Sequence, residues 1–128
     1  MSLIPNPTAA LIEQVLSFRN HRQDVIAANI ANASTPGYRA FDLVLDTAMG
    51  DSPLPMRTDD ARHLRSSGDA GDVPGTAQRS RDPAKLDGNN VSLDAEFLKL
   101  TENRLMYQTA FELYENFGAL TRLAREVR

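Results

Sequence analysis

Residues 92–126 read SLDAEFLKLTENRLMYQTAFELYENFGALTRLARE, and this stretch carries the longer of two helical patterns in the chain. Ser92 is a favourable N-cap, and Asp94 and Glu96 follow in the first turn, where negative charge complements the helix dipole. Apolar residues continue along the predicted helix at heptad spacing. Two adjacent seams result. The first contains Leu93, Phe97, Leu100, Tyr107, Phe111 and Tyr114, and the second contains Met106, Ala110, Leu113, Phe117, Leu120, Ala124 and Val127.

A second helix is predicted near the N-terminus, over residues 8–33, with Asn6 or Thr8 as its cap around Pro7. Its apolar residues also form two seams, and polar residues interrupt both between positions 19 and 24. At about 1.5 Å per residue this helix spans roughly 39 Å, which is long for so small a chain. The seams comprise Leu11, Val15, Phe18 and Val25, and then Ile12, Leu16, Ile26, Ile30 and Ala33.

The segment between the helices, residues 34–90, holds five of the seven prolines and six of the seven glycines. Ser34 to Gly37 predicts a turn, and the alternation from Tyr38 to Leu45 predicts a short strand. Arg57 to Asp87 has few large apolar residues and predicts an extended loop. The expected fold is therefore mainly α. Two long amphipathic helices at the termini form a coiled-coil-like pair, and a loop-rich middle with a short β-strand or hairpin joins them.

This organisation divides the chain into an N-terminal assembly helix at 1–33, a middle at 34–90 and a C-terminal assembly helix at 91–128. Two such helices leave much of both apolar faces in water, and exposed apolar surface of that size usually marks an interface. A self-contained bundle needs another amphipathic helix, which the middle does not supply. Burial between chains is the favoured interpretation. A soluble adaptor or export-chaperone-like module, which binds another protein's helix in a groove, remains the alternative.

Composition excludes several other classes of function. A net charge of −3 gives no electrostatic basis for binding nucleic acid, and the absence of cysteine excludes thiolate catalysis and disulfides. The N-terminal residues lack a cleavable signal peptide pattern, and no apolar run reaches the length of a membrane span. We therefore expect no direct contact with nucleic acid and no transmembrane segment.

No catalytic, cofactor-binding or metal-binding residues are expected. His63 lies near Asp59 and Asp60, but a polar surface histidine is the more common reading of such a loop. Asp94 and Glu96 are explained by their place at a helix N-terminus. The glycine-containing stretch at 71–75 lacks the strand and helix that a phosphate site needs.

Two motifs add a resemblance to this picture. Residues 29–38 read NIANASTPGY, and Asp87 to Val91 read DGNNV just before the C-terminal helix. Together they resemble the flagellar basal-body rod family of bacteria, and the short length and the DGNNV context are most similar to its proximal rod members. Further similarity comes from Glu102, Asn103, Tyr107 and Gln108, and from residues 58–64 with Arg62, His63 and Leu64.

The resemblance implies a structural subunit that donates both terminal helices to the inner layer of a hollow axial tube. That tube would transmit torque and pass later export substrates. The implied partners are copies of the same chain, other rod proteins, the flagellar export gate and an adaptor protein at the rod base. The implied location is the basal-body rod in the periplasm, reached through type III export without a cleaved signal peptide.

The expected assembly interface combines the apolar seams with the two motifs. Asn29 and Asn32 lie three apart on one helical face and offer donors and acceptors to a neighbour. The alternative is that they only help to end the helix, but contact with a neighbour is favoured, because two asparagines in an alanine-rich segment lower helix propensity and need compensation. The full set is Leu11, Val15, Phe18, Ile26, Asn29, Ile30, Asn32, Pro36, Gly37, Tyr38, Asn89, Asn90, Phe97, Leu100, Tyr107, Phe111, Leu113, Phe117 and Leu120.

Overall fold

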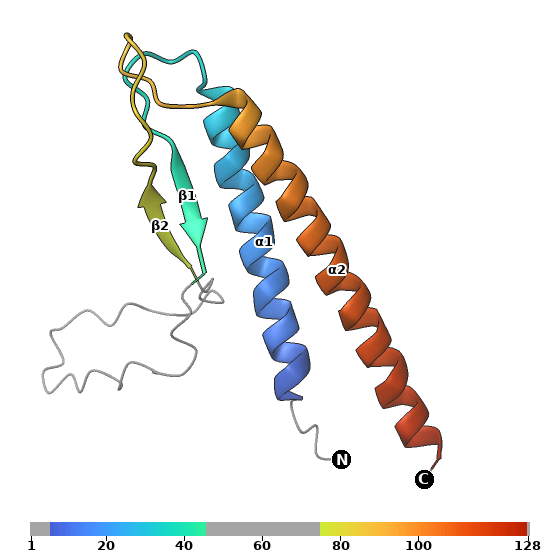
Figure 1. Cartoon of the computed structure of the whole chain (residues 1–128). Coiled ribbons are helices and arrows are strands. Elements are labelled where there is room, and N and C mark those ends of the chain that lie inside the picture. Colours follow the sequence, from blue (N-terminus) through green and yellow to red (C-terminus); the bar gives the residue numbers. More distant parts are fainter. Residues whose placement is uncertain (1–5, 46–74, 128) are drawn as a thin grey trace, which may run out of the picture.

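The computed structural model describes residues 6–45 and 75–127, which form two long helices and a small sheet (Figure 1). In chain order the elements are α1 (Pro7–Ala31), β1 (Phe41–Val44), β2 (Thr76–Arg79) and α2 (Leu93–Glu126). The expected mainly α fold with two packed terminal helices is confirmed. Asp59, Asp60, His63 and the rest of the 58–64 motif lie outside the described residues, as does Gly71.

Helix α1 begins where the sequence predicts. The side-chain oxygen of Asn6 accepts a hydrogen bond from the Thr8 amide at 3.1 Å, so Asn6 is the N-cap, and Pro7 takes the first helical position. The helix ends at Ala31, two residues before the predicted end at 33. Asn32 is the C-cap, and its side-chain amide donates to the carbonyl of Ala28 at 2.8 Å.

Helix α2 also matches its predicted bounds, with Ser92 at the N-cap position. The Ser92 hydroxyl makes no capping hydrogen bond, however, so its side chain does not contribute in the way the sequence suggested. Its carbonyl accepts the first helical hydrogen bond, from the Glu96 amide at 2.9 Å. Asp94 and Glu96 lie in the first turn and Arg125 lies in the last, as the helix dipole favours.

The middle of the chain contains a two-stranded antiparallel sheet. Phe41 pairs with Arg79 and Val44 pairs with Thr76. The observed β1 is shorter than the predicted strand at 38–45, and β2 lies inside the stretch from 57 to 87 that was predicted to be loop throughout. That prediction was wrong for β2, because a short exposed strand without apolar alternation is defined only by the partner strand that binds it.

The helices run antiparallel, so the start of α1 and the end of α2 lie at the same end of the molecule, and the sheet packs beside α1 (Figure 1). The buried apolar residues are few and lie mostly toward the opposite end. Gly75, just before β2, packs closely on the middle of α1, since a methyl group at this position would lie 2.9 Å from the Phe18 ring. No helix in the described part of the chain is both long and apolar enough to cross a bilayer. The core comprises Ile12, Phe18, Ile26, Ala40 and Val91.

A candidate assembly surface and the polar cluster that supports it

Asn29 is the centre of a buried polar cluster near the end of α1 and the start of α2, which we call the closed end of the helix pair. Its side chain is fully buried and makes all four hydrogen bonds that an amide can make. The amide nitrogen donates to the Phe41 carbonyl at 2.6 Å and to Glu96 Oε2 at 3.0 Å. The amide oxygen accepts from the Tyr38 hydroxyl at 3.1 Å and from the Phe41 amide at 3.2 Å. One residue of α1 thus binds β1 and α2 together.

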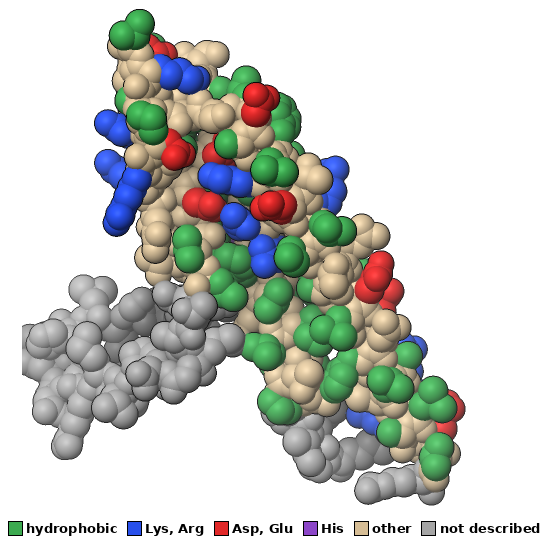
Figure 2. All heavy atoms as spheres, viewed as in Figure 1, with side chains coloured by type: hydrophobic (Ala, Val, Ile, Leu, Met, Phe, Trp, Pro, Cys, Tyr) green, Lys and Arg blue, Asp and Glu red, His purple; other side chains and the backbone are tan. Residues whose placement is uncertain are grey.

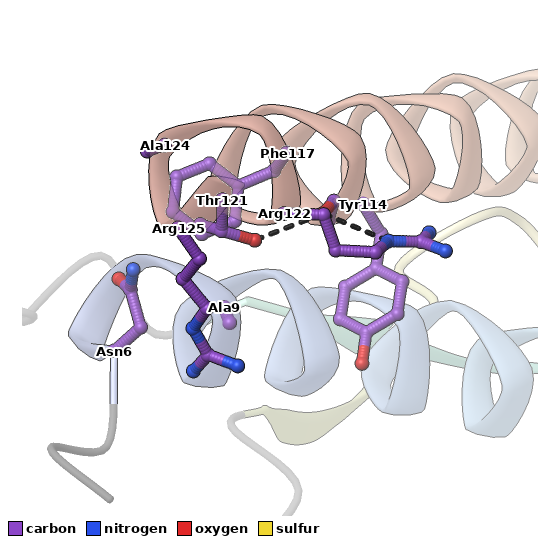
Figure 3. Close-up of a pocket in the computed structure, with 9 residues that line it drawn as sticks. Asn6, Ala9, Tyr114, Phe117, Thr121, Arg122, Ala124 and Arg125 are labelled. Carbon is purple, nitrogen blue, oxygen red and sulfur yellow. Dashed lines mark hydrogen bonds between the residues drawn. The ribbon is translucent and has the colours of Figure 1, made fainter. Parts of the chain in front are cut away.

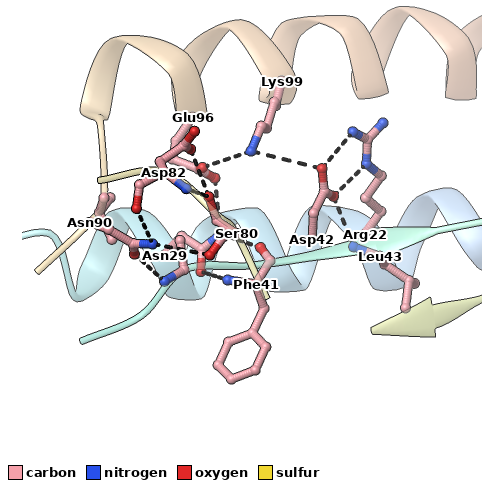
Figure 4. A network of polar contacts seen from close by, with 12 residues as sticks. Arg22, Asn29, Phe41, Asp42, Leu43, Ser80, Asp82, Asn90, Glu96 and Lys99 are labelled. Atoms are coloured by element: carbon pink, nitrogen blue, oxygen red, sulfur yellow. Dashed lines mark hydrogen bonds and ion pairs between the residues drawn. The ribbon is translucent and has the colours of Figure 1, made fainter. Parts of the chain in front are cut away.

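A chain of ionic contacts extends this cluster along the helices (Figure 4). Arg22 binds both carboxylate oxygens of Asp42, at 3.0 and 3.1 Å. Lys99 lies 3.8 Å from Asp42 and 3.1 Å from the buried carboxylate of Glu96. The network therefore contains at least one charged side chain from each of α1, β1 and α2, and it orients these three elements relative to one another.

Arg22 and Asp42 alter each other's ionisation. Burial alone would raise the pKa of the Asp42 carboxyl, but the hydrogen bonds and charge of Arg22, with a smaller contribution from Lys99, lower it below its usual range. The hydrogen bond to Asp42 in turn raises the pKa of Arg22. The pair is therefore held in its charged, bidentate form, which is the geometrically specific one.

Asn89 closes the C-terminal end of α1 from the far side of the sequence. Its side-chain amide donates to the carbonyls of Asn32, Ala33 and Thr35, in the turn that follows α1, at 2.8 to 3.1 Å. Its own side-chain oxygen accepts from the Val91 amide at 2.7 Å. The DGNNV motif therefore acts as a cap for α1 as well as an approach to α2.

Asn90 binds backbone groups of the residues next to the two strands. Its side-chain oxygen accepts from the Ala40 amide at 2.7 Å, and its amide donates to the carbonyls of Ser80 and Asp82. Ser80 also donates its amide to the Ala40 carbonyl at 2.8 Å. The two asparagines together join the NIANASTPGY segment to the residues that precede α2.

Two glycines allow these segments to meet. Gly37 and Gly88 both have positive φ, at 73° and 82°, a backbone conformation that residues other than glycine rarely adopt. The Gly37 amide donates to the Asp87 carbonyl at 2.9 Å. A methyl group on Gly88 would lie 3.3 Å from the Gly37 Cα, so the two backbones are in direct contact.

Farther along the pair, Asn103 links α2 to α1. Its side chain is fully buried, and its amide donates to the Arg19 carbonyl at 2.8 Å. Toward the chain ends the only further polar link between the helices in the described residues is the exposed hydrogen bond from the Tyr114 hydroxyl to Glu13 at 3.0 Å. The helix pair is thus held firmly at one end and loosely at the other.

The loosely held end carries the candidate assembly surface. Figure 2 shows hydrophobic side chains running down the lower half of the helix pair, below a group of charged side chains. Most of them belong to α2, which exposes large apolar side chains on several sides. A helix with this distribution is normally covered by further helices. At this end the exposed large apolar residues of α2 are Leu105, Met106, Phe111, Leu113, Tyr114, Leu120 and Leu123, and Leu93, Phe97 and Leu98 are exposed near the start of the same helix.

A groove of about 550 Å³ opens between the two helices at this end. Tyr114 and Arg125 reach from α2 toward α1 on its two sides (Figure 3). Gly118 forms part of the lining, and a methyl group there would meet only the Arg122 guanidinium, at 4.0 Å. The groove and the exposed apolar residues form a continuous partly apolar surface along the open end of the pair.

The structure divides the sequence-predicted interface residues into three groups. The first, whose side chains are buried inside the chain, comprises Phe18, Ile26, Asn29, Asn89 and Asn90. The second, half-buried, comprises Val15, Ile30, Asn32, Tyr38, Leu100, Tyr107 and Phe117. The third, exposed, comprises Leu11, Pro36, Gly37, Phe97, Phe111, Leu113 and Leu120.

The side chains of the buried group are enclosed by residues of this chain. The Asn29 side chain binds across the molecule, whereas the Asn32 side chain bonds only to Ala28 and Thr35, within its own turn. Contact between the exposed group and other subunits stays a prediction.

Three important residues escaped the sequence reasoning. Asp42 lies within a predicted strand, Arg22 was only an interruption of an apolar seam, and Glu96 was explained by the helix dipole alone. A signal for Glu96 was present, because it lies seven residues before Asn103 on the seam that continues to Ala110. That regular spacing places both polar side chains on the face that meets α1.

The chain is similar in sequence to known flagellar rod proteins. Residues 16–39 match a family described as Flagella basal body rod protein, and this match covers the second half of α1 and the turn after it. A protein from Cereibacter sphaeroides named Flagellar basal body rod protein FlgB is 41% identical over 106 residues, which are 78% of this chain and 79% of that protein. Proteins of the same name from Escherichia coli and Salmonella typhimurium are 31% and 30% identical over 105 residues, or 75% of this chain and 76% of each relative.

Proposed function

This chain belongs to the FlgB family of flagellar basal body rod proteins, and from that premise we propose that it joins the rod through the exposed apolar surface of α1 and α2. The resemblance drawn from the two motifs is confirmed by the match. The chain is a structural subunit of the proximal rod and not an enzyme, and the alternative of a soluble helix-binding adaptor is set aside.

The exposure of α2 is the observation that supports this route of assembly. Leu113 and Leu120 lie one heptad apart and are 58% and 65% exposed, although both are large apolar side chains. Burial of a leucine side chain contributes about 1.5 to 3 kcal/mol. A neighbouring helix that covered this row would therefore gain several such contributions at once, and it would leave the polar closed end of the pair undisturbed.

The finer features of the function are proposed from the family to which the chain belongs. We expect the helices of several subunits to surround a hollow axis, which would carry export substrates and transmit torque. The partners would be copies of this chain, other rod proteins, the export gate and the adaptor at the rod base. The rod would stand in the periplasm after type III export. The open, weakly linked end of the helix pair supports this proposal, because neighbours can insert there at small cost.

Replacement of Leu113 by aspartate tests the proposed surface. We expect Leu113→Asp to abolish incorporation into the rod and swimming motility, because a charge in a covered apolar row is not solvated. The stability of the isolated chain should change little, since the side chain is already exposed. Incorporation is measured by mass spectrometry of purified basal bodies from a strain that expresses only the variant.

Gln108→Asp is the matched control, because Gln108 is an exposed polar residue on the same helix. It should support wild-type motility. Normal motility in Leu113→Asp would show that this row is not covered in the rod, and the proposed surface would have to be abandoned.

A further inference from the structure

The face of α2 that meets α1 is polar at its most buried positions. Glu96 and Asn103, one heptad apart, are 2% and 0% exposed, and Ala110 and Phe117 continue the same row at half-buried positions. The neighbouring row on α2, which contains Met106, Leu113 and Leu120, is more than half exposed. Burial of apolar surface alone would select the opposite arrangement, with the apolar row against α1.

Specific hydrogen bonds explain why α2 adopts this orientation. Glu96 Oε2 accepts from the Asn29 amide at 3.0 Å, and the Asn103 amide donates to the Arg19 carbonyl at 2.8 Å. Residues three apart on a helix differ by about 60° in direction, so a rotation of that size would bring Met106 toward α1 in place of Asn103. Such a rotation would break both hydrogen bonds and leave the buried Asn29 amide short of a partner.

Asn103 is not explained by stability. Its side chain is fully buried, yet among the described residues nothing donates a hydrogen bond to its Oδ1 atom. A buried polar atom without a partner costs about 1 to 3 kcal/mol. A leucine at this position would bury apolar surface without that cost. A polar residue at an inward heptad position commonly sets the register of a helix pair at the expense of stability.

We propose that Asn103, together with Glu96, is a specificity determinant that fixes the rotation and register of α2 on α1. Its effect is to keep the row of Met106, Leu113 and Leu120 facing outward instead of packing against α1. The register of the helix pair stands on the geometry of this chain alone. The use of the outward row by neighbouring subunits rests on the proposed function.

Distance measurements between spin labels test the register directly. The chain has no cysteine, so cysteines introduced at the exposed positions Asn20 and Gln108 accept nitroxide labels specifically. Double electron–electron resonance should give one distance for the otherwise unchanged chain and for Thr101→Leu, an added leucine on an exposed position of α2. Asn103→Leu should give a second distance, with a melting temperature equal to or above that of the parent chain.

Two results would overturn the register assignment. One is a single, unchanged distance in Asn103→Leu, which would mean that the asparagine does not select among orientations. The other is a lower melting temperature for Asn103→Leu, which would make Asn103 an ordinary stabilising residue.

A measurement in cells separates this inference from the proposed function. Asn103→Leu should reduce the amount of chain in purified rods by about tenfold or more, while its total amount in the cell stays unchanged. Wild-type incorporation of Asn103→Leu would contradict the link between register and assembly. If the parent chain and Thr101→Leu were also absent from rods, the proposed function would fail, and the distance measurement would still decide the register.

Discussion

Single asparagine side chains carry much of the tertiary structure of this protein. Asn29, Asn89 and Asn103 are all fully buried, and each binds an element that is distant in the sequence. An amide can donate and accept at once, so one side chain satisfies backbone groups that would otherwise remain unpaired. Apolar residues could not replace Asn29 or Asn89 without leaving several buried polar groups without partners.

At the same scale, Asp42 makes stability depend on pH. Its pKa in the folded chain is lowered by Arg22, so the folded state is stabilised above the unfolded pKa of about 3.9 and loses that contribution as the pH falls through the folded pKa. We expect the chain to lose stability below about pH 4, and expect Asp42→Asn to lack this part of the loss. The free energy of unfolding is measured by urea titration, followed by circular dichroism, from about pH 2 to about pH 7, a range that includes the pKa values of carboxyl groups.

Asp24→Asn is the control for this measurement. Asp24 is exposed and makes no hydrogen bond or ion pair with any residue that the structure describes, so its replacement should leave the pH profile unchanged. Identical profiles for the parent chain and Asp42→Asn would mean that the contact with Arg22 contributes nothing in solution.

At the scale of the elements, two glycines should respond in opposite ways to the same substitution. Gly118→Ala should stabilise α2 by about 1 kcal/mol, because alanine favours the helix and its methyl group meets only the Arg122 guanidinium at 4.0 Å. Gly75→Ala should destabilise the chain by about 1 to 3 kcal/mol, because its methyl group would lie 2.9 Å from the Phe18 ring.

The free energy of unfolding of both variants is obtained from urea titrations. Each variant is the control for the other, since the chemical change is the same. A destabilised Gly118→Ala would mean that the added methyl group meets a close contact in the groove of the free chain, and the prediction would be wrong.

The helices could be predicted from the sequence, but the contacts between them could not. The apolar seams located both helices to within two residues, and Asn6 and Pro7 marked the start of α1. Periodicity and capping can be predicted because they are local properties. The seams did not show which side of α2 meets α1. Leu113 and Phe117 belonged to one predicted seam, yet Leu113 is 58% exposed and Phe117 lines the groove toward α1. The deciding residues are polar, and a hydrophobic pattern registers them only as interruptions.

The sheet illustrates the same limit. The predicted strand around Phe41 rested on its own alternation, but β2 has a polar sequence, Thr76 to Arg79, with no periodic signal. Its conformation depends on pairing with β1, more than thirty residues away along the chain. Such pairing is a long-range property that single-sequence patterns do not contain.

At the scale of the whole molecule, the helix pair should show a gradient of local stability. The closed end holds the buried polar cluster and most of the core, while the open end has exposed apolar residues and the exposed link between Tyr114 and Glu13. We expect amides near Ile26 and Asn29 to exchange with solvent at least about tenfold more slowly than those of α2 beyond Phe111. Hydrogen exchange with mass spectrometry of the full chain measures the gradient.

The result should also depend on assembly. In purified basal bodies the amides of α2 beyond Phe111 should become protected, whereas those near Asn29 should change little. Uniform protection along α2 in the free chain would contradict the division into a firmly and a loosely held end.

The cap on α1 also sets an order of events during synthesis. Asn89 belongs to the last third of the chain, and Glu96 and Asn103 come later still. A ribosome that has released only the first eighty residues has therefore released α1 without its cap and without any part of α2. Until translation is almost finished, α1 can pack only against β1 and β2, and the contacts with α2 that complete the polar cluster are missing. The folded form therefore requires the completed polypeptide. Before completion the chain stays incompletely folded, a state that a narrow conduit can pass or a chaperone can bind.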